Sequence, residues 1–106
     1  MKVVITTSMS FRLWKELVER LIQEDFDKLD KNEYDSEFFE ENGYIYPLKA
    51  NELEFRTDSI LINILESLKD KGDLKIIEIP DNIKYYIESC DIGGSEVIHE
   101  EHRTWY

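Results

Sequence analysis

The hydrophobic pattern of the first 23 residues predicts a strand followed by a helix. Val3-Val4-Ile5 lie within a short run, residues 2–7, that is apolar or neutral on both faces, as is typical of an interior strand. Apolar residues then recur at spacings of three and four, which indicates a helix over residues 11–23, and Ser10 is its expected N-cap. The stripe consists of Phe11, Trp14, Leu17, Val18, Leu21 and Ile22.

The second half of the chain predicts one more helix and three strands. Asp58 is the expected N-cap of a helix with one apolar face, and Gly72 lies where a left-handed residue commonly closes a helix. Residues 74–79, 84–90 and 95–103 are expected to form strands. The breaks between them are Pro80-Asp81-Asn82 and Asp91-Ile92-Gly93-Gly94. The apolar face of the helix consists of Ile60, Leu61, Ile64, Leu65 and Leu68.

This order of elements predicts an α+β fold in a single domain spanning residues 1–106. We expect a two-layer sandwich, in which two helices cover one face of a mixed sheet of about four strands, with a C-terminal β-hairpin. Residues 44–47 form a short extended piece, which Pro47 confines to an edge or a loop. At 106 residues the chain is long enough for one hydrophobic core.

Residues 24–41 differ from the rest in charge. They hold nine acidic and two basic residues, a local net charge of −7, interrupted by aromatic and apolar side chains. We predict a partly irregular insert that extends the first helix, continues as a loop and ends in a helical turn at residues 36–41. The ligand spacing of a calcium-binding EF-hand loop is absent.

The net charge of −11 for the whole chain changes which partners are expected. Such a surface repels phosphate backbones, so we predict no direct nucleic-acid binding. It suits a basic protein surface, including by mimicry of DNA, although solubility alone also explains it. No apolar run is long enough to span a bilayer, and the one cysteine, Cys90, fits a reducing cytoplasm. We therefore predict a cytoplasmic protein without membrane contact.

Two polar clusters are candidate binding residues. Thr6, Thr7, Ser8 and Ser10 lie between the first strand and the predicted helix, where hydroxyls and free amides suit a phosphate or carboxylate. Helix capping within a polar loop is the more common explanation of such residues. His102, Arg103 and Thr104 form a basic group near the other end of the chain, in which Arg103 offers planar donors to an anion. An ion pair between Arg103 and a carboxylate is the alternative.

No metal, cofactor or catalytic motif is expected. His99 and His102 would face opposite sides of a strand, which disfavours a joint metal site. No nucleophile lies in a recognisable context, so we do not predict an enzyme. Trp105 is suited to stacking on a base, to covering a sheet edge or to a subunit contact, and self-association is a further expectation.

Two stretches of the chain resemble a group of small phage-encoded proteins. They are Met1-Lys2-Val3-Val4-Ile5, at the start, and Leu74-Lys75-Ile76-Ile77-Glu78-Ile79-Pro80-Asp81-Asn82, followed by the tyrosine-rich strand and Glu101-His102-Arg103-Thr104-Trp105. The resemblance implies a phage origin and a host cytoplasm, and it implies no mechanism.

Two functions follow as hypotheses. The first is sequestration of a nucleotide-type phosphorylated ligand to counter host defence, with Thr6, Thr7, Ser8, Ser10, His102, Arg103, Thr104 and Trp105 as the ligand-binding residues. The second is an acidic protein-interaction inhibitor, in which residues 24–41 bind a basic host protein.

Overall fold

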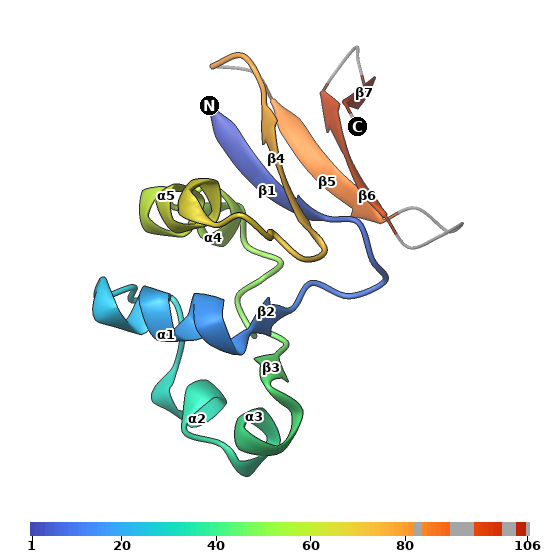
Figure 1. Cartoon of the computed structure of the whole chain (residues 1–106). Coiled ribbons are helices and arrows are strands. Elements are labelled where there is room, and N and C mark those ends of the chain that lie inside the picture. The colour runs from blue at the N-terminus through green and yellow to red at the C-terminus, as the bar shows by residue number, and fades with distance from the viewer. Residues whose placement is uncertain (82–83, 90–94, 101–103, 106) are drawn as a thin grey trace.

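A computed structural model of the chain describes residues 1–81, 84–89 and 95–100, together with the backbone of residues 104–105. Helices and strands occur in separate runs along the described residues, with four strands at the C-terminal side, so the expected α+β class is confirmed. The molecule is elongated, with extents of 43 × 29 × 25 Å, and Figure 1 shows the helices α1 to α3 at one end and the strands β4 to β7 at the other. No helix within the described residues is both long and apolar enough to cross a membrane.

A two-stranded ribbon lies in the middle of the fold. β1 (Lys2–Thr6) pairs antiparallel with β4 (Leu74–Glu78), with Val4 opposite Ile76. Val4 packs into the core on the helical side, whereas Val3 and Ile5 pack on the opposite side against β6. The run Val3-Val4-Ile5 is therefore buried on both faces, as its sequence predicted.

Each face of this ribbon has its own covering layer (Figure 1). On one face lie α1 (Lys15–Gln23), α4 (Leu53–Arg56) and α5 (Ser59–Ser67), whose apolar residues form the larger core. On the other face lies the hairpin of β5 (Tyr85–Ser89) and β6 (Glu96–Glu100), through Ile98 and Ile87. β7 (Thr104–Trp105) pairs with β6.

The predicted single sheet of about four strands is not confirmed. Strand pairing among the described residues forms three small sheets, β1–β4, β2–β3 and β5–β6–β7, and each pairing is antiparallel. The predicted strand over residues 95–103 is described as β6 up to Glu100, and residues 101–103 lie outside the described part. So do Cys90 and the predicted turn at residues 91–94.

The predicted start of the first helix is wrong. α1 begins at Lys15, its N-cap is Trp14, and Ser10 therefore caps nothing. The preceding residues Leu13–Trp14 form β2, which pairs antiparallel with β3 (Tyr44–Ile45), and the Lys15 N–H donates to the Gly43 carbonyl (2.9 Å). This long-range pairing overrides a helical spacing that residues 11 and 14 also satisfied.

The acidic segment, residues 24–41, is folded. It contains α2 (Lys31–Tyr34) and α3 (Glu37–Asn42), and Ser36 caps α3 by accepting from the Phe39 N–H (3.2 Å). The helical turn predicted at residues 36–41 is confirmed, whereas the predicted extension of the first helix is wrong, because α1 ends at Gln23 and Asp25 takes a left-handed φ of 56°.

The cap of the second predicted helix is confirmed, and its closing residue is wrong. Asp58 accepts from the Ile60 N–H (2.8 Å). Its other oxygen accepts from Lys28 Nζ (2.6 Å), which ties the acidic segment to α5 and raises the pKa of Lys28 above its ordinary value. Gly72 has a positive φ of 55° but does not end the helix, since α5 stops at Ser67 and Leu68 is already extended.

Candidate functional site

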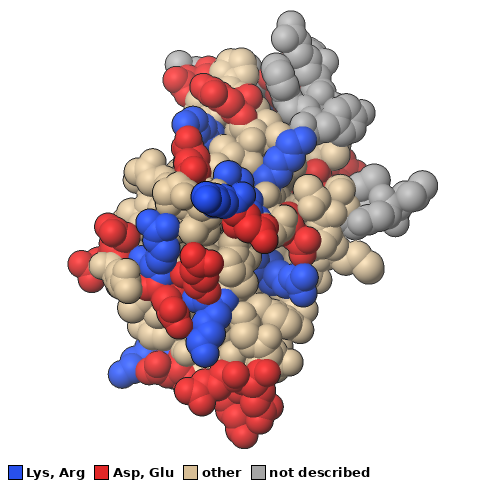
Figure 2. Space-filling model, in the orientation of Figure 1, with Lys and Arg blue, Asp and Glu red and all other residues tan. Residues whose placement is uncertain are grey.

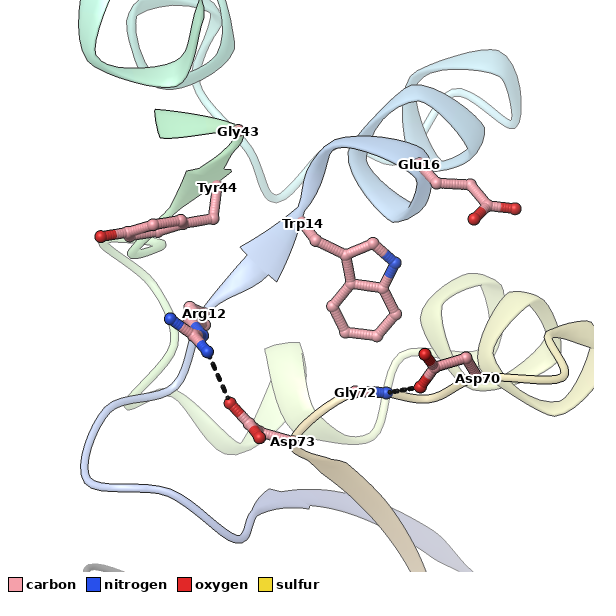
Figure 3. A pocket seen from close by; sticks show the side chains of 8 residues that line it. All are labelled: Arg12, Trp14, Glu16, Gly43, Tyr44, Asp70, Gly72 and Asp73. Atoms are coloured by element: carbon pink, nitrogen blue, oxygen red, sulfur yellow. Dashed lines mark hydrogen bonds and ion pairs between the residues drawn. The ribbon is translucent and has the colours of Figure 1, made fainter. Parts of the chain in front are cut away.

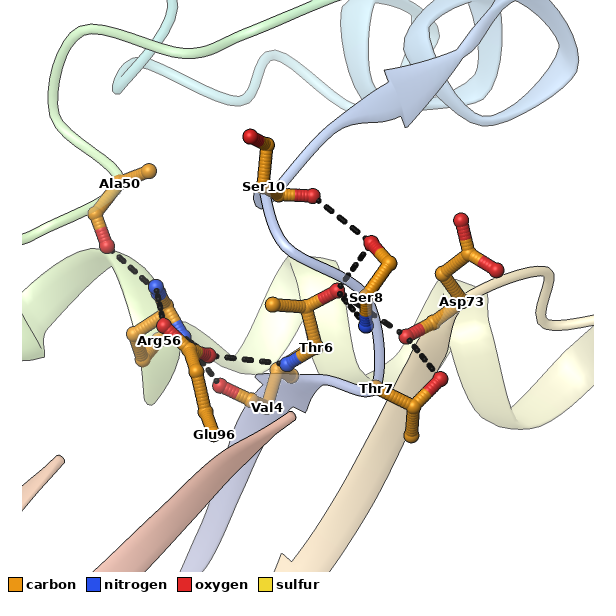
Figure 4. A network of polar contacts seen from close by, with 9 residues as sticks. All are labelled: Val4, Thr6, Thr7, Ser8, Ser10, Ala50, Arg56, Asp73 and Glu96. Atoms are coloured by element: carbon orange, nitrogen blue, oxygen red, sulfur yellow. Dashed lines mark hydrogen bonds and ion pairs between the residues drawn. The ribbon is translucent and has the colours of Figure 1, made fainter. Parts of the chain in front are cut away.

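The hydroxyl groups of the predicted binding loop, residues 6–10, form hydrogen bonds within the loop and to the backbone beside it. Thr6 Oγ1 lies 3.1 Å from Ser8 Oγ, and Ser8 Oγ donates to the Ser10 carbonyl (3.0 Å). Thr6 and Thr7 both donate to the Asp73 carbonyl, at 3.3 and 3.2 Å (Figure 4). The loop leads into β2 and not into a helix, so the amides and dipole of a helix N-terminus, on which the predicted anion site depended, are not at Ser10.

Beside this loop lies a buried ion pair that the sequence did not indicate. Arg56 is 2% exposed and binds Glu96 through two parallel contacts, Nη1 to Oε1 (2.6 Å) and Nη2 to Oε2 (2.9 Å). The guanidinium also donates to the carbonyls of Ala50 (2.5 Å) and Val4 (3.1 Å), and the Thr6 N–H donates to Glu96 Oε1 (2.9 Å). Figure 4 shows that this network joins α4, β1 and β6.

The network is structural in character. Its charges are paired, its donors meet backbone acceptors, and the Arg56 guanidinium stacks over the Phe11 ring with its carbon 4.0 Å from the ring centroid. A bidentate arginine–carboxylate pair of this kind fixes orientation as well as energy. It therefore holds the β5–β6 hairpin on the central ribbon and offers no open coordination to a ligand.

The second predicted cluster is described only in part. His102 and Arg103 lie outside the described residues, and only the backbone of Thr104 and Trp105, in β7, is described. In register, Trp105 faces Ile98 and Thr104 faces His99, whereas Glu96 is the β6 residue that contacts Thr6. A joint site between the two predicted clusters stays a prediction.

A cleft of about 380 Å³ lies between the β2–β3 pair and the loop before β4. Its walls combine two aromatic side chains, one arginine and three carboxylates (Figure 3). The lining residues are Arg12, Trp14, Glu16, Gly43, Tyr44, Asp70, Gly72 and Asp73. The volume falls in the range of roughly 300–1,000 Å³ that small-molecule sites occupy.

One side of the cleft already holds a guanidinium. Arg12 Nη2 donates to Asp73 Oδ2 (3.0 Å), and the Arg12 guanidinium carbon lies 5.2 Å from the Tyr44 ring centroid. Trp14 separates this group from two further carboxylates, Glu16 and Asp70 (Figure 3). The cleft is thus built of aromatic faces and carboxylates, which is the chemistry that attracts cations.

An exposed group of aromatic rings continues from the cleft toward α3. We call Phe38, Tyr44 and Tyr46 the aromatic strip; their ring centroids are 5.3 to 6.3 Å apart. Phe38 and Tyr46 are 45% and 48% exposed, and the neighbouring Leu48 is 76% exposed. A side-chain hydrogen bond with Tyr44 is the main cause that raises the pKa of Tyr46 above its ordinary value.

The carboxylates of the acidic segment lie next to this strip. Figure 2 shows Asp and Glu side chains gathered at the end of the molecule where Figure 1 places α2 and α3. Phe26, Leu29 and Phe39 of the segment are buried, whereas Glu37, Glu40 and Glu41 are exposed. The segment therefore packs its apolar side inward and presents its charge outward.

The shape of the cleft depends on Gly72, and this gives a testable prediction. A Cβ at Gly72 would lie 3.0 Å from the Trp14 ring, and its φ is +55°; at Gly43, with a φ of +76°, a Cβ would meet nothing within 4 Å. We expect Gly72→Ala to lower the free energy of unfolding by about 2–3 kcal/mol, and Gly43→Ala by about 1 kcal/mol, because only the former adds a steric contact to the backbone strain.

Urea unfolding and tryptophan emission in a Trp105→Phe background measure both effects. Gly72→Ala should shift the emission of Trp14 and Gly43→Ala should not. Equal losses of stability with unchanged emission would contradict this packing of Trp14 on the Gly72 backbone.

The described residues contain no group of three or more His, Cys, Asp or Glu side chains arranged to hold a metal ion. His99 lies 2.8 Å from the Glu88 carboxylate through its Nε2 and stacks on Tyr86, with ring centroids 5.1 Å apart.

Comparison with known proteins finds no family model, no curated protein and no solved structure that matches this chain.

Proposed function

We propose that the protein binds a basic partner protein through the acidic segment and the adjacent aromatic strip. The observation that carries this proposal is the folded state of residues 24–41. Two capped helices hold their carboxylates outward beside exposed aromatic rings, and the apolar side of the segment is anchored in the core.

A fixed acidic face is better suited to recognition than a flexible acidic tail. The Asp30 N–H donates to Glu33 (2.9 Å), and the other oxygen of the same carboxylate accepts from the Leu48 N–H (2.7 Å), which ties α2 to the stretch after β3. Because this backbone is already ordered, binding costs less conformational entropy. The surrounding charge also accelerates encounter with a positively charged surface.

The aromatic strip supplies the apolar part of such an interface. Exposed aromatic residues are enriched at the centres of protein–protein interfaces, where they account for much of the binding energy, while charges at the rim steer the approach. Phe38 lies on α3 itself, so the strip and the carboxylates of α3 belong to one continuous face. This face suits a partner whose lysine and arginine side chains surround an apolar patch.

Neutralising α3 tests the proposal. We expect the triple variant Glu37→Gln, Glu40→Gln, Glu41→Gln to bind a fluorescein-labelled peptide of alternating lysine and arginine roughly five- to tenfold more weakly than the parent chain at low salt. The measurement is fluorescence anisotropy over a series of salt concentrations, since the attraction is screened as salt is added.

The matched control removes three carboxylates elsewhere. Glu52, Glu54 and Glu78 are exposed and lie outside the acidic segment, so changing them to glutamine alters the net charge equally. We expect this control to weaken binding by less than about threefold. If the two triple variants bind alike, the attraction comes from net charge alone and the proposed face is wrong.

A second candidate function is the binding of a small phosphorylated ligand, and one observation favours it. A hollow of about 300 Å³ is lined by Ser8, Met9, Ser10, Arg12 and Tyr46, which offers hydroxyls, a guanidinium and an aromatic ring in one place. The ligand expected from the sequence is a nucleotide-type phosphorylated molecule used in host defence. Native mass spectrometry with linear and cyclic nucleotides should then show a bound species that Arg12→Ala removes, and the absence of any bound nucleotide would count against this candidate.

A further inference from the structure

We propose that the cleft beside Trp14 receives one lysine or arginine side chain of the basic partner. This inference rests on the proposed function and names the position at which a single cationic group would be held. It concerns the side of the cleft that faces Glu16 and Asp70, away from Arg12 (Figure 3).

The cleft already holds a cation of the same chemistry, the guanidinium of Arg12. Arg12 lies between the Tyr44 ring and the Asp73 carboxylate, at 5.2 Å from the ring centroid and 3.0 Å from the oxygen. The geometry shows that a guanidinium fits against these walls. Trp14 offers a second and larger aromatic surface in the same cleft, and tryptophan is the side chain that attracts cations most strongly.

Negative charge remains on the far side of Trp14, where Glu16 and Asp70 lie. Within the described part of the chain, no lysine, arginine or histidine forms an ion pair with Glu16 or Asp70. Asp70 accepts from the Gly72 N–H (2.8 Å), a contact that fixes its carboxylate at the cleft wall. An incoming cationic group would therefore meet an aromatic face and two carboxylates without displacing an existing cation.

The cleft is also continuous with the proposed interface. Tyr44 belongs both to the cleft and to the aromatic strip, and Gly43, which ends α3, also lines the cleft. A partner lying across the strip and α3 would thus reach the cleft with a single long side chain. A lysine or arginine suits this because its apolar stem packs on the indole while its charged end meets the carboxylates.

The test compares two substitutions in the cleft, one that removes the aromatic face and one that removes a carboxylate. Trp14→Leu removes the aromatic face without changing the net charge, and Glu16→Gln removes one carboxylate of the cleft. Glu19→Gln is the matched control, because Glu19 is an exposed residue of the same helix that does not line the cleft. Binding of the lysine–arginine peptide is measured by anisotropy, and thermal unfolding of each variant confirms that it is folded.

We expect Trp14→Leu and Glu16→Gln each to weaken the peptide roughly two- to fivefold, and Glu19→Gln to change it by less than about 1.5-fold. If the peptide binds and all three variants match the parent chain, the cleft is not used, and the α3 triple variant alone decides whether the α3 face is. If the cleft variants weaken binding and the α3 triple variant does not, the cleft stands without the proposed face. If the parent chain does not bind the peptide at low salt, both proposals fail. If Trp14→Leu is unfolded, the comparison of peptide binding by Glu16→Gln and Glu19→Gln decides whether the cleft is used.

Discussion

Replacing Glu96 with alanine is expected to lower the free energy of unfolding by about 3–5 kcal/mol. The substitution leaves the Arg56 guanidinium 2% exposed without its carboxylate partner. It also removes the acceptor of the Thr6 N–H, which lies 2.9 Å from Glu96 Oε1. A buried charge that has lost its partner is among the most costly single defects in a folded protein.

Chemical denaturation of the parent chain and the variant measures this loss. Glu88→Ala is the matched control, because Glu88 lies on the paired strand β5, is exposed and forms its ion pair with the partly exposed His99. We expect that control to cost less than about 1 kcal/mol. Similar small losses for both variants would contradict the assignment of Glu96 as the anchor of the β5–β6 hairpin.

The same network predicts strong coupling between its two charges. Arg56→Met alone leaves the Glu96 carboxylate, whose side chain is 10% exposed, without its cation. Arg56→Met combined with Glu96→Ala removes both charges and should cost clearly less than the sum of the single losses. The double variant should still be less stable than the parent chain. Arg56 also donates to the carbonyls of Val4 and Ala50, which would be left without these donors.

The second large effect is expected at Phe55. This ring is fully buried, and it makes edge-to-face contacts with Phe11 (centroids 5.8 Å apart) and Phe26 (5.4 Å). It therefore joins the start of the acidic segment to the main core. Phe55→Ala should lower the free energy of unfolding by about 3–5 kcal/mol through lost burial and the cavity that remains.

Phe38→Ala is the matched control for Phe55→Ala, both for stability and for peptide binding. Phe38 is 45% exposed, so its removal should cost less than about 1 kcal/mol, yet it should weaken the lysine–arginine peptide because Phe38 belongs to the aromatic strip. Denaturant unfolding and peptide anisotropy on the same two variants separate the roles. A large loss of stability at Phe38, or none at Phe55, would contradict this division between core and surface.

The elements that the sequence predicted are those specified by local signals. α5 follows from its apolar repeat and the Asp58 cap, and β1 and β4 follow from their apolar runs. The helical turn predicted at residues 36–41 is α3. Each of these depends on residues close together in the chain, so the pattern alone was sufficient.

The elements that the sequence missed depend on residues far apart in the chain. β2 is a two-residue strand that exists because Leu13 pairs with Ile45, and no local pattern specifies such a contact. Its partner β3 lies in the extended piece predicted at residues 44–47, but the sequence did not indicate the pairing. The same pairing moves the start of α1 to Lys15 and builds the cleft between Trp14 and Gly72. A spacing of three and four residues cannot distinguish a helical turn from a short paired strand when the partner is 30 residues away.

The buried ion pair was missed for a related reason. Arg56 and Glu96 lie 40 residues apart in the sequence, and neither differs in type from the many other charged residues of the chain. The signal that could have been used is a charged residue beside fully apolar neighbours: Arg56 follows Phe55, and Glu96 precedes Val97-Ile98. Such positions place a charge at the edge of a core, where it needs a partner.

The central claim is that one face of this molecule, made of α3, the aromatic strip and the Trp14 cleft, binds cationic protein surfaces. The most direct test is a ¹H–¹⁵N NMR titration of the labelled protein with the lysine–arginine peptide. Saturable shifts are expected mainly in α3, in residues 44–46 and in the indole N–H of Trp14, with few shifts in α5. Shifts spread evenly over all exposed carboxylates, or confined to residues outside this face, would contradict it.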